Sequence, residues 1–163
     1  MGKNTFKWKW SIVTIFALGI VGIGCSRDDP ASRIGAMNNT RIKQLSNLYM
    51  AHQMRNGSNG PKDEAEFKTF IKNGMPAHRL EMMRVDPNKV DDLFVSERDG
   101  QPFEIKYGQS GGPMSRLAVV FEKEGQAGKK QVGFTNGKVE DLDDAKYQEQ
   151  LQAKKQPGAG PAK

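Results

Sequence analysis

The chain has few of the residues that most often perform acid–base or metal chemistry, and their spacing suits neither. Its two histidines, His52 and His78, form no His-x3-His or similar ligand pair. His52 extends an apolar stripe of helical spacing that contains Leu45, Leu48 and Tyr49, so we expect it to pack half-buried rather than to catalyse. His78 lies near the start of a predicted helix and is expected to face solvent.

The paired carboxylates are interpreted as helix caps and solubilising charge. Asp91-Asp92 and Asp143-Asp144, with Asp141 close by, point in different directions and bracket predicted turns instead of converging on a cation. Ser110-Gly111-Gly112 is not followed by the Lys-Ser/Thr pair of a phosphate-binding loop. Five spaced methionines are expected to fill the core rather than to bind a metal: Met50, Met54, Met75, Met82 and Met83.

The sequence therefore predicts no catalytic, cofactor-binding or metal-binding residues, which favours a non-enzymatic protein. The alternative is an enzyme whose Asp, Glu, Tyr or Arg groups meet only in the folded chain.

The single cysteine, Cys25, ends an uncharged apolar run of 14 residues that begins at Ser11. The ten residues before that run carry three lysines and no acid. A basic segment followed by a short apolar one is typical of a signal peptide, and the run is shorter than the ~18–20 residues needed to span a bilayer. Small residues, Gly22 and Gly24, stand at the −3 and −1 positions before the cysteine.

The stretch Gly22-Ile23-Gly24-Cys25 resembles a bacterial lipobox, with Gly22 where that family usually has an aliphatic residue. The resemblance implies cleavage before Cys25, a lipid on its thiol, and a membrane-anchored protein of the bacterial cell envelope that faces the periplasm or the exterior. By the same analogy Ser26, in place of Asp, favours the outer membrane. An uncleaved anchor from Trp8 to Ile23 remains the alternative.

Cleavage at that point would leave 139 of the 163 residues, a length that suits one domain. The removed segment holds three lysines and no acid, so the formal charge would fall from +6 to +3. That charge is spread along the chain without a basic run, so we expect no nucleic-acid partner. We predict a signal peptide at 1–24, a tether at 25–35, a single α+β domain at 36–153 and a disordered tail at 154–163.

Helical periodicity governs the first half of the domain. The first predicted helix covers residues 36–55, with Ile42, Leu45, Leu48 and Tyr49 facing inward and with Arg41, Lys43, Gln44 and Asn47 facing outward. A second is expected to start at Pro61 and to bury Phe67, Phe70 and Ile71, and a short third covers residues 76–84.

Alternating apolar residues and turn signals predict an antiparallel sheet in the second half. Strands are expected at 93–98, 103–107, 117–122, 131–135 and 138–142, before a last helix capped by Asp143-Asp144. Asp99-Gly100 and Asn136-Gly137 are expected in type I′ turns, with positive φ at both residues of the second. Gly125, in a longer loop, is expected to tolerate a side chain better than Gly137. Val119 and Phe121 are predicted to share a face that Val120 does not.

Two strings in this half resemble pilin-like proteins. Glu97 to Phe103, followed by Tyr107-Gly108, resembles the D-x-x-G-x-P-[YF] hairpin of type II secretion pseudopilins. Gly133 to Val139 resembles the end of the bacterial H-x9-DG pilin-like family, with Lys138 where that family has histidine. The resemblance, which covers about residues 93–142, implies an N-terminal helix packed on a sheet of hairpins.

Pilins keep a processed hydrophobic helix with a glutamate near its start, whereas this chain has the stretch that resembles a lipobox. The resemblance therefore implies a fold and not filament assembly. The expected partners are the membrane, through a lipid on Cys25, and another envelope protein. A pseudopilin-like subunit of a secretion or pilus-type assembly, held by an uncleaved anchor, is the alternative.

Overall fold

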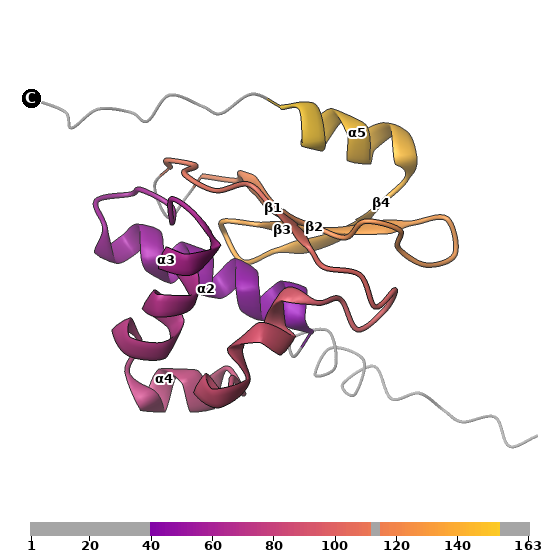
Figure 1. Cartoon of the computed structure of the whole chain (residues 1–163). Coiled ribbons are helices and arrows are strands. Elements are labelled where there is room, and N and C mark those ends of the chain that lie inside the picture. The colour runs from indigo at the N-terminus through magenta and orange to yellow at the C-terminus, as the bar shows by residue number, and fades with distance from the viewer. Residues whose placement is uncertain (1–39, 112–114, 154–163) are drawn as a thin grey trace, which may run out of the picture.

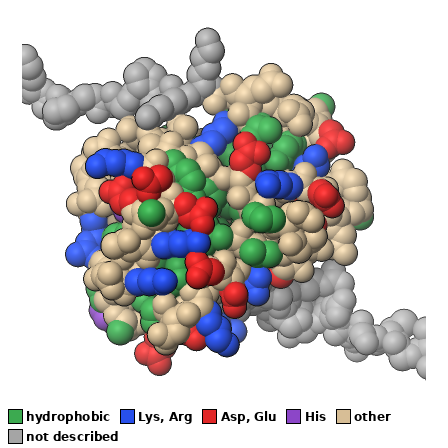
Figure 2. All heavy atoms as spheres, viewed as in Figure 1, with side chains coloured by type: hydrophobic (Ala, Val, Ile, Leu, Met, Phe, Trp, Pro, Cys, Tyr) green, Lys and Arg blue, Asp and Glu red, His purple; other side chains and the backbone are tan. Residues whose placement is uncertain are grey.

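The computed structural model describes residues 40–111 and 115–153, which form an α+β domain (Figure 1). The predicted signal peptide, tether and tail lie outside the described residues, and so does Cys25. No helix within the described ranges combines the length and the apolar character that crossing a membrane requires. Acidic and basic side chains are interspersed on the face shown in Figure 2.

Helix α2, Arg41–Arg55, is the central helix of the domain. Its predicted inward stripe is buried, because Ile42, Leu45, Leu48 and Tyr49 are each at most 1% exposed. Gln44, predicted to face outward, is buried instead. Its Nε2 donates hydrogen bonds of 2.9 and 3.3 Å to two carbonyl oxygens in the turn that follows helix α4. A polar side chain can be buried when hydrogen bonds satisfy it, and here the partners lie about 40 residues away.

Shorter helices pack beside α2. Helix α3, Glu64–Thr69, begins after Asp63, whose side chain accepts a hydrogen bond from the Glu66 N–H, so Pro61 precedes the helix instead of starting it. A π-helical turn follows at Phe70–Gly74, then α4 at Ala77–Met82. A 3₁₀ helix occupies Pro87–Phe94.

That 3₁₀ helix replaces the start of the first predicted strand. Its last residues, Leu93 and Phe94, are buried in the helical core, and only Val95 pairs across the hairpin, with Pro102. The predicted strand at 93–98 is therefore wrong: the stretch ends a 3₁₀ helix and then forms a single bridge.

Four strands form one antiparallel sheet in the order β1-β2-β3-β4. They are β1 at Glu104–Ile105, β2 at Ala118–Phe121, β3 at Lys130–Phe134 and β4 at Val139–Leu142. The last three agree with the predicted strands to within about one residue at each end. Helix α2 contacts β2 and β3 on one face of the sheet, and α5, Asp144–Gln152, covers the other face (Figure 1).

Both predicted type I′ turns are corrected by the structure. Between β3 and β4, Gly137 has a positive φ of +72° and Asn136 does not. Phe134 N–H donates to Lys138 O, and Gly137 N–H donates to Phe134 O. This is a three-residue loop with a left-handed glycine at its end, not a two-residue turn. In the earlier hairpin, likewise, Gly100 has positive φ and Asp99 does not.

A β-bulge in β2 changes the predicted alternation of faces. Ala118 pairs with Phe134 and Val120 pairs with Gly133, so Val119 is an extra residue without a partner on β3. Val119 and Val120 therefore join the same core cluster beneath α2. Phe121 belongs to the cluster under α5, where its ring meets Tyr147 edge to face at 5.8 Å.

A buried carboxylate that was not predicted follows β2 directly. Glu122 is 1% exposed and accepts hydrogen bonds of 2.9 Å from Ser96 Oγ and Gln131 N–H. Arg98 Nη1 lies 3.4 Å from the same carboxylate and 2.7 Å from Asp141. Asp141 was expected to act as a cap or a solubilising charge, but it forms an ion pair with Arg98, the cation that also pairs with Glu122.

Candidate functional site

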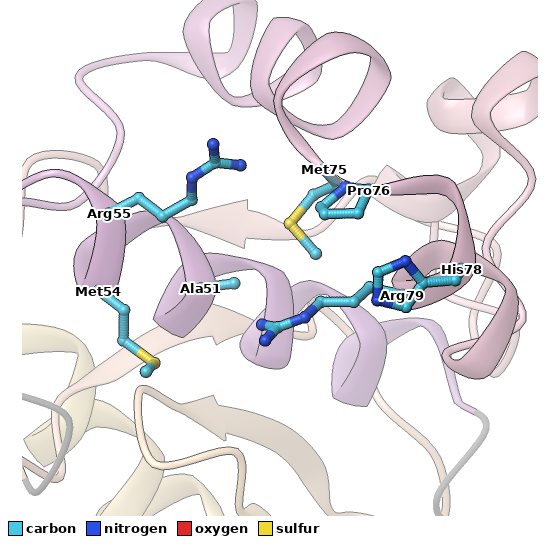
Figure 3. Close-up of a pocket in the computed structure, with 7 residues that line it drawn as sticks. All are labelled: Ala51, Met54, Arg55, Met75, Pro76, His78 and Arg79. Carbon is cyan, nitrogen blue, oxygen red and sulfur yellow. The ribbon is translucent and has the colours of Figure 1, made fainter.

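An open groove lies between α2 and the chain that enters α4 (Figure 3). Its two adjoining parts have volumes of about 460 and 490 Å³, within the range of pockets that bind ligands or anchoring side chains. The lining is mostly apolar, and it comprises Asn47, Met50, Ala51, Met54, Arg55, Met75, Pro76, His78, Arg79, Met82 and Met83.

Helical spacing explains why these side chains gather there. Residues 47, 50, 51 and 54 of α2 are three and four apart, so they form a second stripe beside the buried one. Residues 78, 79, 82 and 83 face them from α4 and the residue after it. Leu80 points away from the groove into the core, where it is 3% exposed.

Two methionines at the groove are exposed, which corrects their predicted place in the core. Met54 is 63% exposed and Met82 is 81% exposed, and they are the only exposed large apolar side chains of the described residues. Met75 is buried as expected, at 8% exposure, and Met50 and Met83 are intermediate. The second stripe of α2 is thus only partly covered by the rest of the domain.

The ionisable side chains that line the groove are two arginines and one histidine. Arg79 is exposed, and its guanidinium group makes neither a hydrogen bond nor an ion pair with another described residue. Figure 3 shows its side chain extending from α4 toward α2. Arg55 donates a hydrogen bond to Gly74 O and lies over the Phe70 ring, 6.0 Å from its centroid. His78 is exposed, as predicted, and no acidic residue of the described chain lines the groove.

His52 lies in a second, polar hollow of about 400 Å³, which Lys62, Glu66 and Ser110 also line. It packs edge to face on Phe70 at 4.9 Å, as the predicted packing role requires, but at 3% exposure it is buried and not half-buried as predicted. His52 Nδ1 lies 3.1 Å from a carbonyl oxygen, which can only accept, so Nδ1 carries the hydrogen. Its Nε2 lies 3.8 Å from Glu66 Oε1.

Among the described residues that line the polar hollow, no nucleophile is hydrogen-bonded to a base. Ser110 Oγ donates to Asn59 Oδ1 at 2.9 Å, and not to His52. Tyr49, behind the hollow, donates from its hydroxyl to Lys106 O at 2.9 Å. Burial raises the pKa of Tyr49 to about 12, so its phenol is neutral at physiological pH. The geometry fits structural hydrogen bonding better than covalent catalysis.

The paired carboxylates near the other turns do not converge on one point. Asp91 pairs with Lys68 at 2.6 Å, and Asp143 caps α5 by accepting a hydrogen bond of 3.0 Å from Lys146 N–H. Within residues 40–111 and 115–153, no three His, Cys, Asp or Glu side chains come together as a metal site would require. No family model, curated protein or solved structure matches this chain.

Proposed function

We propose that this protein is a lipid-anchored, non-enzymatic protein of the bacterial cell envelope that binds a partner through the groove between α2 and α4. The observation that carries the binding role is that Met54 and Met82, the exposed large apolar side chains of the described chain, line one groove. Apolar groups gathered at a hollow on a domain surface mark interaction sites. Methionine suits such a surface because its flexible thioether adapts to differently shaped partners.

The anchor is supported by the sequence. A basic segment, a short apolar run and Cys25 follow one another in the order of a bacterial lipoprotein signal. Each buried CH₂ of an acyl chain contributes about 0.8 kcal/mol, so two or three chains on Cys25 would hold the protein at the membrane. The domain would then face the periplasm or the exterior, and Ser26 favours the outer membrane.

A pseudopilin-like subunit held by an uncleaved anchor is the second candidate. The observation that favours it is the packing of α2 against β2 and β3, within a sheet whose last two strands form a hairpin. That arrangement is the one that the pilin-like resemblance implies.

Intact-mass analysis of the membrane-extracted chain, with fractionation of a Cys25→Ser variant, tests the anchor. We expect the wild-type mass to lack residues 1–24 and to include acyl groups. The variant should be unprocessed or released from the membrane. Unchanged processing and retention of the Cys25→Ser variant would refute the lipid anchor. An intact mass equal to that of the whole chain would support the uncleaved anchor.

A further inference from the structure

We propose that the groove between α2 and α4 receives a single amphipathic helix of a protein partner, and that this helix carries acidic residues beside its apolar stripe. The inference rests on the binding role proposed above and specifies the chemistry of the partner.

The shape of the groove suits a helix. One wall is a stripe of α2 with helical spacing, residues 47, 50, 51 and 54, and the other wall comes from α4 and the chain before it. Met75, which is 8% exposed, lies at the floor of the groove opposite the small Ala51. Met54 and Met82 lie at the edges of the groove. Helices that bind such grooves insert side chains at i, i+3, i+4 and i+7.

The charge of the groove suits an acidic helix. The Arg79 side chain has no hydrogen-bond or ion-pair partner among the described residues and extends toward α2, and Arg55 stands at the α2 side (Figure 3). No acidic side chain of the described residues lines the groove to neutralise them. Glutamate or aspartate beside the apolar stripe of the partner would reach both guanidinium groups.

Two other occupants fit less well. A second copy of this chain, docked groove to groove, would place Arg79 against its own symmetry mate, and like charges disfavour that contact. A flat membrane surface could touch the exposed Met54 and Met82 but would not reach Met75 at the floor.

Two designed helical peptides of about 18 residues, long enough to form a helix, would test the proposal. Both carry one Leu/Met stripe, which Glu flanks in the first peptide and Lys in the second. The full chain is held in nanodiscs of neutral phosphatidylcholine, and binding is measured by fluorescence anisotropy against empty nanodiscs. Vesicles that contain anionic phosphatidylglycerol form a third probe.

The Glu peptide should bind at least about fivefold more tightly than the Lys peptide, the ratio expected from one well-placed ion pair. Arg79→Glu should abolish or reverse that preference. Lys123→Glu makes the same charge change at an exposed residue outside the groove, and it should preserve the preference. Met54→Gln with Met82→Gln should weaken both peptides about tenfold, because the apolar contacts are lost.

Three results would overturn the inference. If the Lys peptide bound as tightly as the Glu peptide, still through Met54 and Met82, the acidic helix would be wrong while the binding role of the groove survived. If anionic vesicles bound in an Arg79-dependent way and neither peptide did, the partner would be a membrane. If no probe responded to Met54 or Met82, both the inference and the proposed binding role would fail, whereas the anchor is tested separately through Cys25.

Discussion

Gly133→Ala should destabilise the domain, because α2 lies against the sheet at this residue. A Cβ at position 133 would lie 2.1 Å from Ser46 Oγ and 3.2 Å from Ile42 Cγ1, both on α2. Gly133 has no positive φ, so backbone strain does not contribute to the expected cost. The substitution therefore measures how closely the helix and the sheet approach each other.

The magnitude follows from what Ser46 can do in response. Ser46 is fully buried, and its Oγ donates a 2.7 Å hydrogen bond to Ile42 O. It can keep that bond and overpack the core, or rotate and lose it, and either response costs about 1–3 kcal/mol. In a Ser46→Ala background the nearest remaining atom is Ile42 Cγ1 at 3.2 Å. Gly133→Ala should then cost less than about 1 kcal/mol, which gives a coupling energy of about 1 kcal/mol or more.

Urea and thermal unfolding, followed by circular dichroism, would measure this double-mutant cycle. The four chains would begin at residue 25 and carry Cys25→Ser. For a domain of this size, 1 kcal/mol corresponds to a shift in Tm of about 4 °C. Equal destabilisation by Gly133→Ala in both backgrounds, or none in either, would refute the close approach of α2 to β3.

Two further predictions concern the loop between β2 and β3. Gly125 and Gly128 both have positive φ, +74° and +72°, but only at Gly125 would a Cβ meet backbone, 2.2 Å from Lys129 O. Gly125→Ala should therefore lower Tm clearly more than Gly128→Ala, and equal shifts would contradict the loop geometry. The expectation that Gly125 tolerates a side chain better than Gly137 is wrong on this structure, because a Cβ at Gly137 would first meet a side-chain atom, Asn47 Oδ1 at 2.4 Å, and not backbone. Burial opposes the ionisation of Asp99, but hydrogen bonds from the N–H groups of Gly125, Gln101 and Glu124 together lower its pKa. Because the pKa of Asp99 is lower in the folded than in the unfolded chain, its ionisation stabilises the fold at a pH above the unfolded-state pKa of about 3.9. This stabilisation is lost as the pH falls through the folded-state pKa. Asp99→Asn should thus reduce stability at pH 7 and flatten the acid limb of a stability–pH curve, and an unchanged curve would count against these bonds.

Local chemistry was enough to predict most elements of the domain. The apolar spacing of Ile42, Leu45, Leu48 and Tyr49 describes the buried face of α2, and Asp143 caps α5 as its position suggested. The glycine of Asn136-Gly137 takes positive φ, although the turn around it is longer than predicted. Each of these features depends on a few consecutive residues, which is why a sequence pattern can predict it.

The candidate site could not be predicted in the same way. The pattern of α2 shows that Met50 and Met54 lie on one stripe, but it cannot show that α4 leaves this stripe open. Met54 and Met82 are apolar residues of a type that usually lies in the core, and they are exposed only because no neighbouring helix covers them. The groove is therefore a property of packing between segments that lie about 30 residues apart in the chain.

The sequence by itself determined the α+β class and most strand positions, because periodicity and turn residues are local properties. The lipid anchor at Cys25 stays a prediction. The tertiary structure decided which polar groups are buried and which apolar groups stay exposed. Gln44 is buried because carbonyl oxygens near the end of α4 accept its hydrogen bonds. Val119 faces α2 because a bulge, invisible in the alternation of residues, adds one residue to β2. Whether a side chain is buried depends on which distant segment packs over it. That contact forms only in the folded chain, so a local sequence pattern does not contain it.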